Sequence, residues 1–174
     1  MRLRVKLASA AAVSLMLASG PAAAQSRIIH PLLLRLLVPH NVERSHWGVG
    51  PLQWDAGLAS AADAYAADLA RTNRWGHRAK AARPGQGENL WMGSRGAFSP
   101  EQMVGGWLSE AGHYRRGVFP NVSRTGAWSD VGHYTQIIWR QTTRVGCAIR
   151  SNGRWDYLVC RYSPHGNVDG RVAA

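Results

Sequence analysis

The sequence predicts a mixed α+β fold, on the evidence of one helical pattern and one hairpin pattern. Leu58, Ala62, Tyr65 and Leu69 recur at the i, i+4, i+7 and i+11 spacing of a helix with one apolar face. Farther along, two strand-like runs, each with one cysteine, flank Ser151-Asn152-Gly153, whose residue types are typical of a hairpin turn. Pattern alone indicates no more than this mixed class.

Residues 1–24 have the pattern of a secretory signal peptide. Arg2, Arg4 and Lys6 form a basic start, an apolar run follows, and Ala22-Ala23-Ala24 is a typical cleavage site. The run is too short to span a bilayer comfortably, so we expect no transmembrane segment once it is removed. Residues 25–174 have the length of a single domain, which we expect to be secreted or periplasmic and monomeric.

The chain is strongly basic. Its formal charge of +11 falls to +8 without residues 1–24, because that segment holds three basic and no acidic residues. This balance favours an anionic neighbour such as membrane lipid or a wall polymer, although a solvated basic surface without a partner is the simpler explanation. No Lys/Arg-rich run with interleaved aromatic residues indicates nucleic-acid binding. Low Lys and high Arg and Ala content suggests a GC-rich bacterial source.

Residues 28–44 predict an N-terminal helix. Pro31 suits its first turn, whereas Pro39 is expected to kink the helix or break it into two pieces. We interpret His40, Asn41 and Arg44 as structural residues that tie this helix to neighbouring loops, in preference to a functional role.

Asp55 suits the N-cap of the second helix, which carries Leu58 to Leu69. After that helix, residues 71–98 are rich in Arg, Gly, Asn and Pro and show no clear period, which predicts a long irregular segment. Such segments are often functional loops. His77 and Glu88 stand out within it, although each alone is more typical of an ordinary surface residue.

A third helix is predicted to begin at Ser99-Pro100-Glu101-Gln102, which suits a capping box. Its apolar face is expected to carry Met103, Trp107, Glu110 and Tyr114. Glu110 must then be paired or neutralised, because an unpaired buried charge costs several kcal/mol. Its carboxylate either contributes to a cleft or forms an internal salt bridge with an arginine. If it serves a cleft, Glu110→Gln is expected to be tolerated by the fold, and Glu110→Leu even to stabilise it.

After a Gly/Ser-rich connection over residues 115–131, His133 opens a short helix that runs through Trp139. In the hairpin that follows, Val145, Cys147 and Ile149 point to one side of the first strand. Leu158, Cys160 and Tyr162 share one side of the second strand. Two cysteines in an exported chain favour a Cys147–Cys160 disulfide. A two-residue Asn152-Gly153 turn would place Cys147 opposite Leu158, so the disulfide requires a loop of about four residues or a bulge. Residues 163–174 predict a wrapping coil.

Four short motifs occur in order along the chain: the HNxxR pattern of His40, Asn41 and Arg44; GENL at residues 87–90; GHYTQIIWRQT at 132–142; and YLVCRYSP at 157–164, followed by Gly166-Asn167-Val168. Together they resemble the signatures of the CAP superfamily, the SCP-like secreted domain shared by cysteine-rich secretory and plant pathogenesis-related proteins. The resemblance covers roughly residues 36–170. It implies an α-β-α sandwich with a small antiparallel sheet between helices.

The resemblance also implies that His77, Glu88, Glu110 and His133 converge in a cleft. His77 and His133 would be direct ligands of Zn²⁺ or another divalent ion, and Glu88 and Glu110 would orient their rings or accept a proton from bound water. Two protein ligands make a weak site, because catalytic zinc normally has three. The family often has Ser after the upstream His and Cys before GENL, where this chain has Arg78 and Gln86.

Two functions from different classes follow. The first is an exported binding module whose cleft takes a lipid, a sterol-like molecule or a surface polymer, as the resemblance implies. The second is a metal-assisted hydrolase with Glu88 or Glu110 as the base. No G-x-S-x-G elbow, P-loop or HExxH motif is present, and both cysteines are expected to be paired. We favour binding, because the four residues offer few metal ligands. Loss of function on chelation would distinguish the hydrolase.

Overall fold

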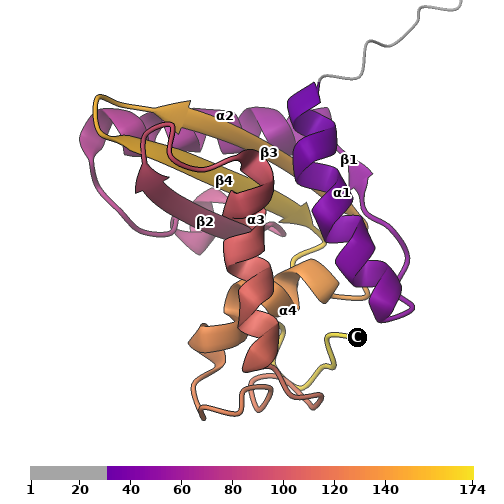
Figure 1. The fold of residues 1–174 in the computed structure, drawn as a ribbon. Helices are drawn as coiled ribbons and strands as arrows, with labels where there is room; N and C mark the ends of the chain where they lie inside the picture. The colour runs from indigo at the N-terminus through magenta and orange to yellow at the C-terminus, as the bar shows by residue number, and fades with distance from the viewer. Residues whose placement is uncertain (1–30) are drawn as a thin grey trace, which may run out of the picture.

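A computed structural model describes residues 31–174, which form one sheet with helices on both faces (Figure 1). The predicted signal peptide and residues 25–30 lie outside the described residues. The helices are α1 (Pro31–His46), α2 (Ala56–Thr72), α3 (Pro100–Leu108) and α4 (Gly132–Ile138). The strands are β1 (Gln53–Trp54), β2 (Gly87–Ser94), β3 (Arg144–Ser151) and β4 (Trp155–Ser163). None of the helices in residues 31–174 is long and apolar enough to cross a membrane.

Alternate residues of β4 pack into two separate hydrophobic cores, one on each face of the sheet. The fold therefore has three layers. Tyr157 and Val159 pack with Leu90 against the apolar stripe of α2. Leu158, Cys160 and Tyr162 point to the opposite face, toward α1, α3 and α4. Figure 1 shows α2 behind the sheet and α1 and α3 in front of it. The α-β-α sandwich is therefore confirmed, with a sheet of order β1-β3-β4-β2.

The sheet is mixed rather than wholly antiparallel, because the short strand β1 pairs parallel to β3. The prediction of an irregular segment over residues 71–98 is wrong for residues 87–94. They form the edge strand β2, antiparallel to β4, and are not part of an irregular segment. Residues 87–90 are all buried, so this half of the strand lacks the apolar and polar alternation by which a half-exposed strand is recognised.

α1 is one continuous helix with Pro39 inside it, so the predicted break is wrong. Three buried residues on both sides of Pro39 hold the helix: Leu36, His40 and Arg44. Arg44 donates to the backbone carbonyls of Gly50, Ile137, Trp139 and Thr142. Asn41 exchanges two hydrogen bonds with the backbone of Leu52. These tertiary contacts offset the cost of an interior proline, about 3 kcal/mol, and confirm the structural interpretation of the HNxxR residues.

The ends of α2 and α3 follow the predicted signals. Asp55 caps α2 by accepting from the backbone N–H of Leu58 at 2.8 Å. Ser99 and Gln102 form the capping box of α3. However, α3 ends at Leu108, and Glu110 lies in a 3₁₀ turn, η2 (Ser109–Gly112), rather than on a continuing α-helical stripe.

The β3–β4 hairpin has the register that the disulfide requires. Cys147 is directly opposite Cys160, and the two are bonded. The last register pair is Ser151 with Asp156, and residues 152–154 lie between the two strands, where a loop of about four residues or a bulge was predicted. The predicted coil wraps back to the core, where the backbone N–H of Arg140 donates to the carbonyl of Ala173 at 2.6 Å.

Candidate functional site

His77 and Glu88 form the first of two histidine–carboxylate pairs. His77 lies in the loop between α2 and β2, and Glu88 is the second residue of β2. Nδ1 of His77 is 2.8 Å from Oε1 of Glu88, and the same oxygen accepts from the backbone N–H of Arg78 at 3.0 Å. The Glu88 side chain is fully buried, whereas 53% of the His77 side chain is exposed. The carboxylate therefore anchors a ring that stays open to solvent.

Arg161 compensates the charge of Glu88 from the neighbouring strand. Its Nη2 lies 2.8 Å from Oε2 of Glu88, and the two residues are register partners on β4 and β2. The ring of Tyr65 faces the guanidinium groups of both Arg161 and Arg78, at 5.4 and 5.5 Å. Burial lowers the pKa of Arg161, and the nearby carboxylate opposes that shift. Both oxygens of Glu88 are thus engaged.

Glu110 and His133 form the second pair. Nδ1 of His133 lies 2.6 Å from Oε1 of Glu110, and Oε2 accepts from the backbone N–H groups of His133 and Tyr134, both at 3.0 Å. The His133 ring also stacks on Trp107, with centroids 5.9 Å apart. The predicted pairing of Glu110 is confirmed, but its partners are a histidine and the start of α4 rather than an arginine.

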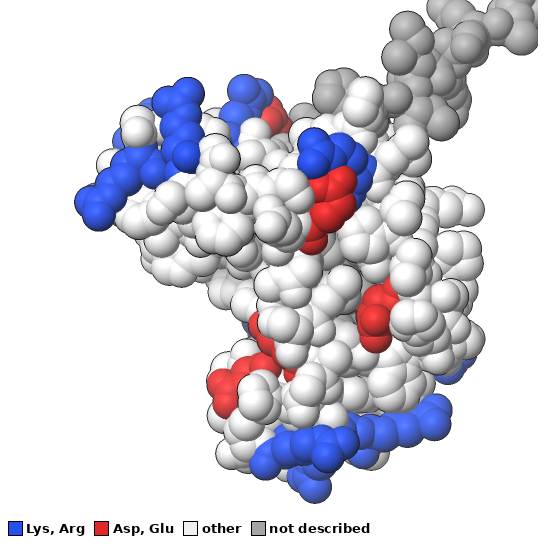
Figure 2. All heavy atoms as spheres, in the orientation of Figure 1, with Lys and Arg blue, Asp and Glu red and all other residues white. Residues whose placement is uncertain are grey.

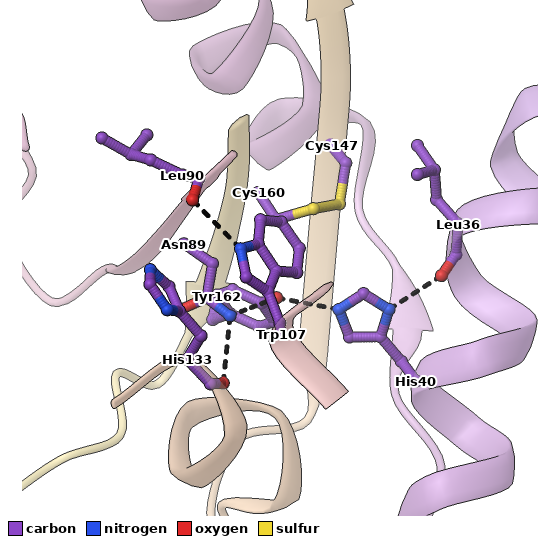
Figure 3. Close-up of a disulfide and its surroundings, with 9 residues drawn as sticks. All are labelled: Leu36, His40, Asn89, Leu90, Trp107, His133, Cys147, Cys160 and Tyr162. Carbon is purple, nitrogen blue, oxygen red and sulfur yellow. Dashed lines mark hydrogen bonds between the residues drawn. A yellow bond between two sulfur atoms is a disulfide. The ribbon is translucent and has the colours of Figure 1, made fainter. Parts of the chain in front are cut away.

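A chain of buried hydrogen bonds connects α1 with the backbone of His133 (Figure 3). Nδ1 of His40 lies 2.7 Å from the Leu36 carbonyl, which can only accept, so Nε2 accepts from the Tyr162 hydroxyl at 2.8 Å. The side-chain amide of Asn89 donates to that hydroxyl at 3.2 Å and to the His133 carbonyl at 3.1 Å. Burial lowers the pKa of His40 to about 4. The ring is therefore neutral near pH 7 and fixed in one tautomer.

Both histidines of the pairs line one cleft. Its volume is ≈ 910 Å³, and it lies between the loop before β2, α4 and the coil after β4. Glu88 also lines it, but Glu110 does not and acts only through His133. Three of the four predicted site residues therefore border a common cavity, and the fourth supports one of them.

The cleft lining has a cationic stretch and an apolar stretch. The first contains Arg78, Lys80 and Arg83; the second contains Phe119, Pro120 and Trp128. Trp128 is 47% exposed and packs on Phe119 with centroids 5.3 Å apart. Arg83 donates to the carbonyls of Arg78 and Gln86, so it holds the loop as well as adding charge.

Gly87, Gln136 and Gly166 line the cleft where β2, α4 and the final coil meet. The Gly166 N–H donates to Oε1 of Gln136 at 2.8 Å. A Cβ atom at Gly87 would overlap the Gln136 amide, and one at Gly166 would press on Trp139. These motif residues are therefore explained by close packing around the cleft.

The two histidines have the donor chemistry for a divalent ion, although the set is small. In each, Nδ1 is held by a carboxylate, and Nε2 has no hydrogen-bond partner within residues 31–174. A ligating histidine typically has its other nitrogen held in this way. No group of three or more His, Cys, Asp or Glu side chains in the described part of the chain is placed to hold a metal.

Sequence reasoning missed Asn89, Arg161 and His165, and it did not single out Lys80, Phe119 or Trp128 of the cleft lining. Asn89 and Arg161 act through the β2–β4 pairing, which was not predicted. His165 is an exposed residue of the cleft lining and lies between the YLVCRYSP motif and Gly166. The signal that could have identified His165 from the sequence is its imidazole side chain.

Solved structures with this fold include NaASP2 with Zn²⁺, at a TM-score of 0.67 and 25% identity, covering 80% of this chain and 82% of that one. Another is BmVAL-1, at a TM-score of 0.68 and 23% identity, covering 86% and 84%. The class of protein that the fold and the paired residues define is thus an α-β-α domain with a histidine–carboxylate cleft.

The sequence comparisons identify the family. The family model described as CAP, the cysteine-rich secretory protein family, matches residues 37–162. Pathogenesis-related protein PR-1 type of Sambucus nigra is 38% identical over 134 residues, which cover 76% of this chain and 75% of the relative. Pathogenesis-related protein 1 of Arabidopsis thaliana is 40% identical over 129 residues, covering 74% and 73%. The chain belongs to the CAP family of cysteine-rich secretory proteins.

Proposed function

We propose that this chain is an exported binding protein whose cleft holds one small amphiphile, a lipid or sterol-like molecule with an anionic group. The observation that carries the proposal is the division of the cleft lining into a cationic stretch at residues 78–83 and an aromatic stretch at residues 119–128. An anionic group suits the first, and an apolar body suits the second. The cleft volume of ≈ 910 Å³ falls in the range typical of small-molecule sites, about 300–1,000 Å³.

Lys80 is the cation best placed to act on a ligand. It is exposed, lines the cleft and has no acidic partner among residues 31–174. Arg83, by contrast, is occupied with backbone carbonyls. Trp128 has the corresponding role for the apolar part, because about half of its surface is exposed and burying an aromatic side chain contributes roughly 2 kcal/mol.

A divalent ion would be held by Nε2 of His77 and of His133, with Glu88 and Glu110 orienting the rings. When bound, it would supply positive charge for an anionic group of the ligand. We regard it as an aid to binding rather than as the centre of a hydrolase. Glu88 and Glu110 each have both oxygens engaged by hydrogen bonds or an ion pair, so neither is a free base.

Secretion is the location that fits this function. The family is named for secreted proteins, and residues 1–24 have the composition of an export signal. The periplasm and the bacterial source stay predictions from composition, and the relatives named above come from plants.

The experiment is identification of the molecule that co-purifies with the exported protein. Native mass spectrometry should show a single adduct, and solvent extraction should release an amphiphile. The variant Lys80→Gln/Trp128→Ser should lose the adduct, while Arg74→Gln/Trp75→Ser, which removes one cation and one exposed tryptophan outside the cleft, should keep it. An adduct retained equally by both variants would contradict the proposal. Loss of binding after chelation would show that the ion is required.

A further inference from the structure

The tip of the β3–β4 hairpin and the end of α2 border a second hollow, which shares no lining residue with the cleft. It has a volume of ≈ 510 Å³ and is lined by Asn73, Asn152, Gly153, Arg154 and Trp155. β2 spans the distance between the two places, since Gly87 lines the cleft and Ser94 pairs with Trp155 at the hairpin tip. Asn89, the last β2 residue in the cleft lining, is five residues from Ser94, which corresponds to about 17 Å of strand.

The floor of the hollow is held rigidly by Asn152. Its side-chain amide donates to Oδ1 of Asn73 at 2.7 Å and to the Ala70 carbonyl at 3.2 Å, which ties the hairpin to the end of α2. Its Oδ1 accepts from the backbone N–H groups of Arg154 and Trp155, at 2.9 and 2.8 Å. A ligand would therefore meet a preformed surface, which lowers the ordering cost of binding.

Three arginines without acidic partners lie in the lining of this hollow or next to it along the chain or through a hydrogen bond. Arg74, Arg95 and Arg154 are exposed and form no ion pair within residues 31–174. Arg95 donates to the Asn152 carbonyl at 3.2 Å, and the guanidinium of Arg154 lies 4.7 Å from the ring centroid of Trp155. Figure 2 shows Lys and Arg side chains gathered at the upper left, over the end of the hairpin seen in Figure 1.

The nearest carboxylate does not neutralise these charges. Asp156 is buried and accepts from the backbone N–H of Gly96 at 2.7 Å and from the hydroxyl of Ser151. Elsewhere on α2 and β3 the exposed arginines do have partners, as Arg71 has Asp68 and Arg150 has Asp63. The hairpin tip is therefore a local excess of positive charge.

A large aromatic surface accompanies the charge. Trp75 is 50% exposed and rests on Tyr157 with ring centroids 6.4 Å apart. The exposed leucine and valine side chains within residues 31–174 lie elsewhere, namely Leu34, Val38, Val42, Val118 and Val172, whereas the exposed Met92 is the register partner of Tyr157. The hairpin tip thus offers guanidinium groups, polar backbone and indole rings, and Met92 is the one exposed leucine, valine or methionine side chain near it within residues 31–174.

We infer that the hairpin tip binds an acidic polysaccharide, a chain of sugar units that carry carboxylate groups. Guanidinium groups match carboxylates by paired hydrogen bonds, and an exposed indole packs against the apolar face of a sugar ring. The hollow is open and shallow, so a polymer can pass across it. This site is separate from the cleft and does not depend on the function proposed for the cleft.

The test uses the mature protein and polygalacturonate as the probe, with neutral dextran as the reference polymer. Arg74→Gln/Trp75→Ser should bind polygalacturonate at least about 10-fold more weakly than the parent. The matched variant Lys80→Gln/Trp128→Ser should stay within about 2-fold, because it leaves the hairpin tip intact. Equal losses in the two variants would overturn the inference, as would no loss in either.

A second comparison separates a defined site from general charge attraction. Arg95→Gln/Arg154→Gln and Arg140→Gln/Arg171→Gln each remove two exposed positive charges, the first pair at the hairpin tip and the second away from it. Only the first should weaken binding by about 10-fold. The protein could instead bind phosphatidylserine vesicles as tightly as polygalacturonate, with equal losses in the hairpin-tip variants. That result would show that the partner is a membrane surface and would contradict the inference.

Discussion

The carboxylate of Glu110 holds His133 both by its ring and by its backbone. Oε1 lies 2.6 Å from Nδ1 of the ring, and Oε2 accepts from the N–H of His133 at 3.0 Å. The second oxygen also accepts from the N–H of Tyr134, so Glu110 serves the otherwise unpaired N–H groups at the start of α4. One side chain therefore orients a cleft histidine and stabilises the helix that carries it.

This geometry reverses the expectation that leucine at position 110 stabilises the fold. Glu110→Leu should lower the free energy of unfolding by about 2–3 kcal/mol, because three donors lose their acceptor. Glu110→Gln keeps one acceptor oxygen and should lose about 1 kcal/mol. Urea unfolding of both variants measures the difference. A leucine variant as stable as the parent would show that Glu110 contributes nothing to the start of α4.

The helices were predictable because their signals are local. Asp55, Ser99 and Gln102 act on backbone groups within three residues, and the stripe of α2 repeats along one face. Pro39 was misjudged for the opposite reason, since the contacts that hold α1 around it come from distant residues such as Trp139 and Tyr162.

The site was predicted only in part. The motifs contain Glu88 and His133, and the family resemblance added His77 and Glu110, but nothing along the chain showed that Glu88 faces Arg161 or that Asn89 reaches His133. Those contacts depend on the register of β2 against β4. The first half of β2 is buried and carries polar residues, which hides it from a search for alternating patterns.

Removal of the disulfide should destabilise the fold without disturbing the cleft. Cys147→Ala/Cys160→Ala should lower the free energy of unfolding by about 3 kcal/mol, the value expected for so short a closed loop. Both cysteines are buried in the core shared by α1, α3 and α4. Urea unfolding is the measurement, with binding of the cleft probe as the control. Free thiols in the intact mass of the exported parent would contradict the disulfide itself.

Acid should weaken the fold through His40. Burial is the largest cause that lowers its pKa from 6.5 to about 4, so the unfolded chain takes up the proton more readily than the folded one. The stabilising contribution is then complete above about pH 6.5 and is lost as the pH falls toward 4, by up to about 3 kcal/mol.

Urea unfolding between about pH 7 and pH 4.5 measures this effect. His40→Gln should be less stable at neutral pH but should show a flatter decline than the parent. His46→Gln is the control, because the His46 side chain is 66% exposed and its removal should leave the decline unchanged. The same slope in the parent and in His40→Gln would rule out this role of His40.

Zn²⁺ should bind modestly and in competition with protons. His77→Ala/His133→Ala should abolish uptake in a calorimetric titration, whereas His46→Ala/His113→Ala, which removes two exposed histidines, should not. Affinity should fall as the pH is lowered, because each imidazole must be neutral to donate its lone pair. Glu110→Gln should weaken it by about 10-fold to 100-fold. Equal uptake by the two double variants would mean that the cleft is not a metal site.

The most direct measurement for the cleft is a titration of the mature protein with the fluorescent fatty acid cis-parinaric acid. We expect saturable binding of one molecule per chain. Affinity should drop about 10-fold or more in Lys80→Gln/Trp128→Ser, since each 1.4 kcal/mol of lost contact is about 10-fold, and should be unchanged in Arg74→Gln/Trp75→Ser. Unsaturable binding, or equal affinity in the parent and the cleft variant, would contradict the claim that this cleft binds an amphiphile.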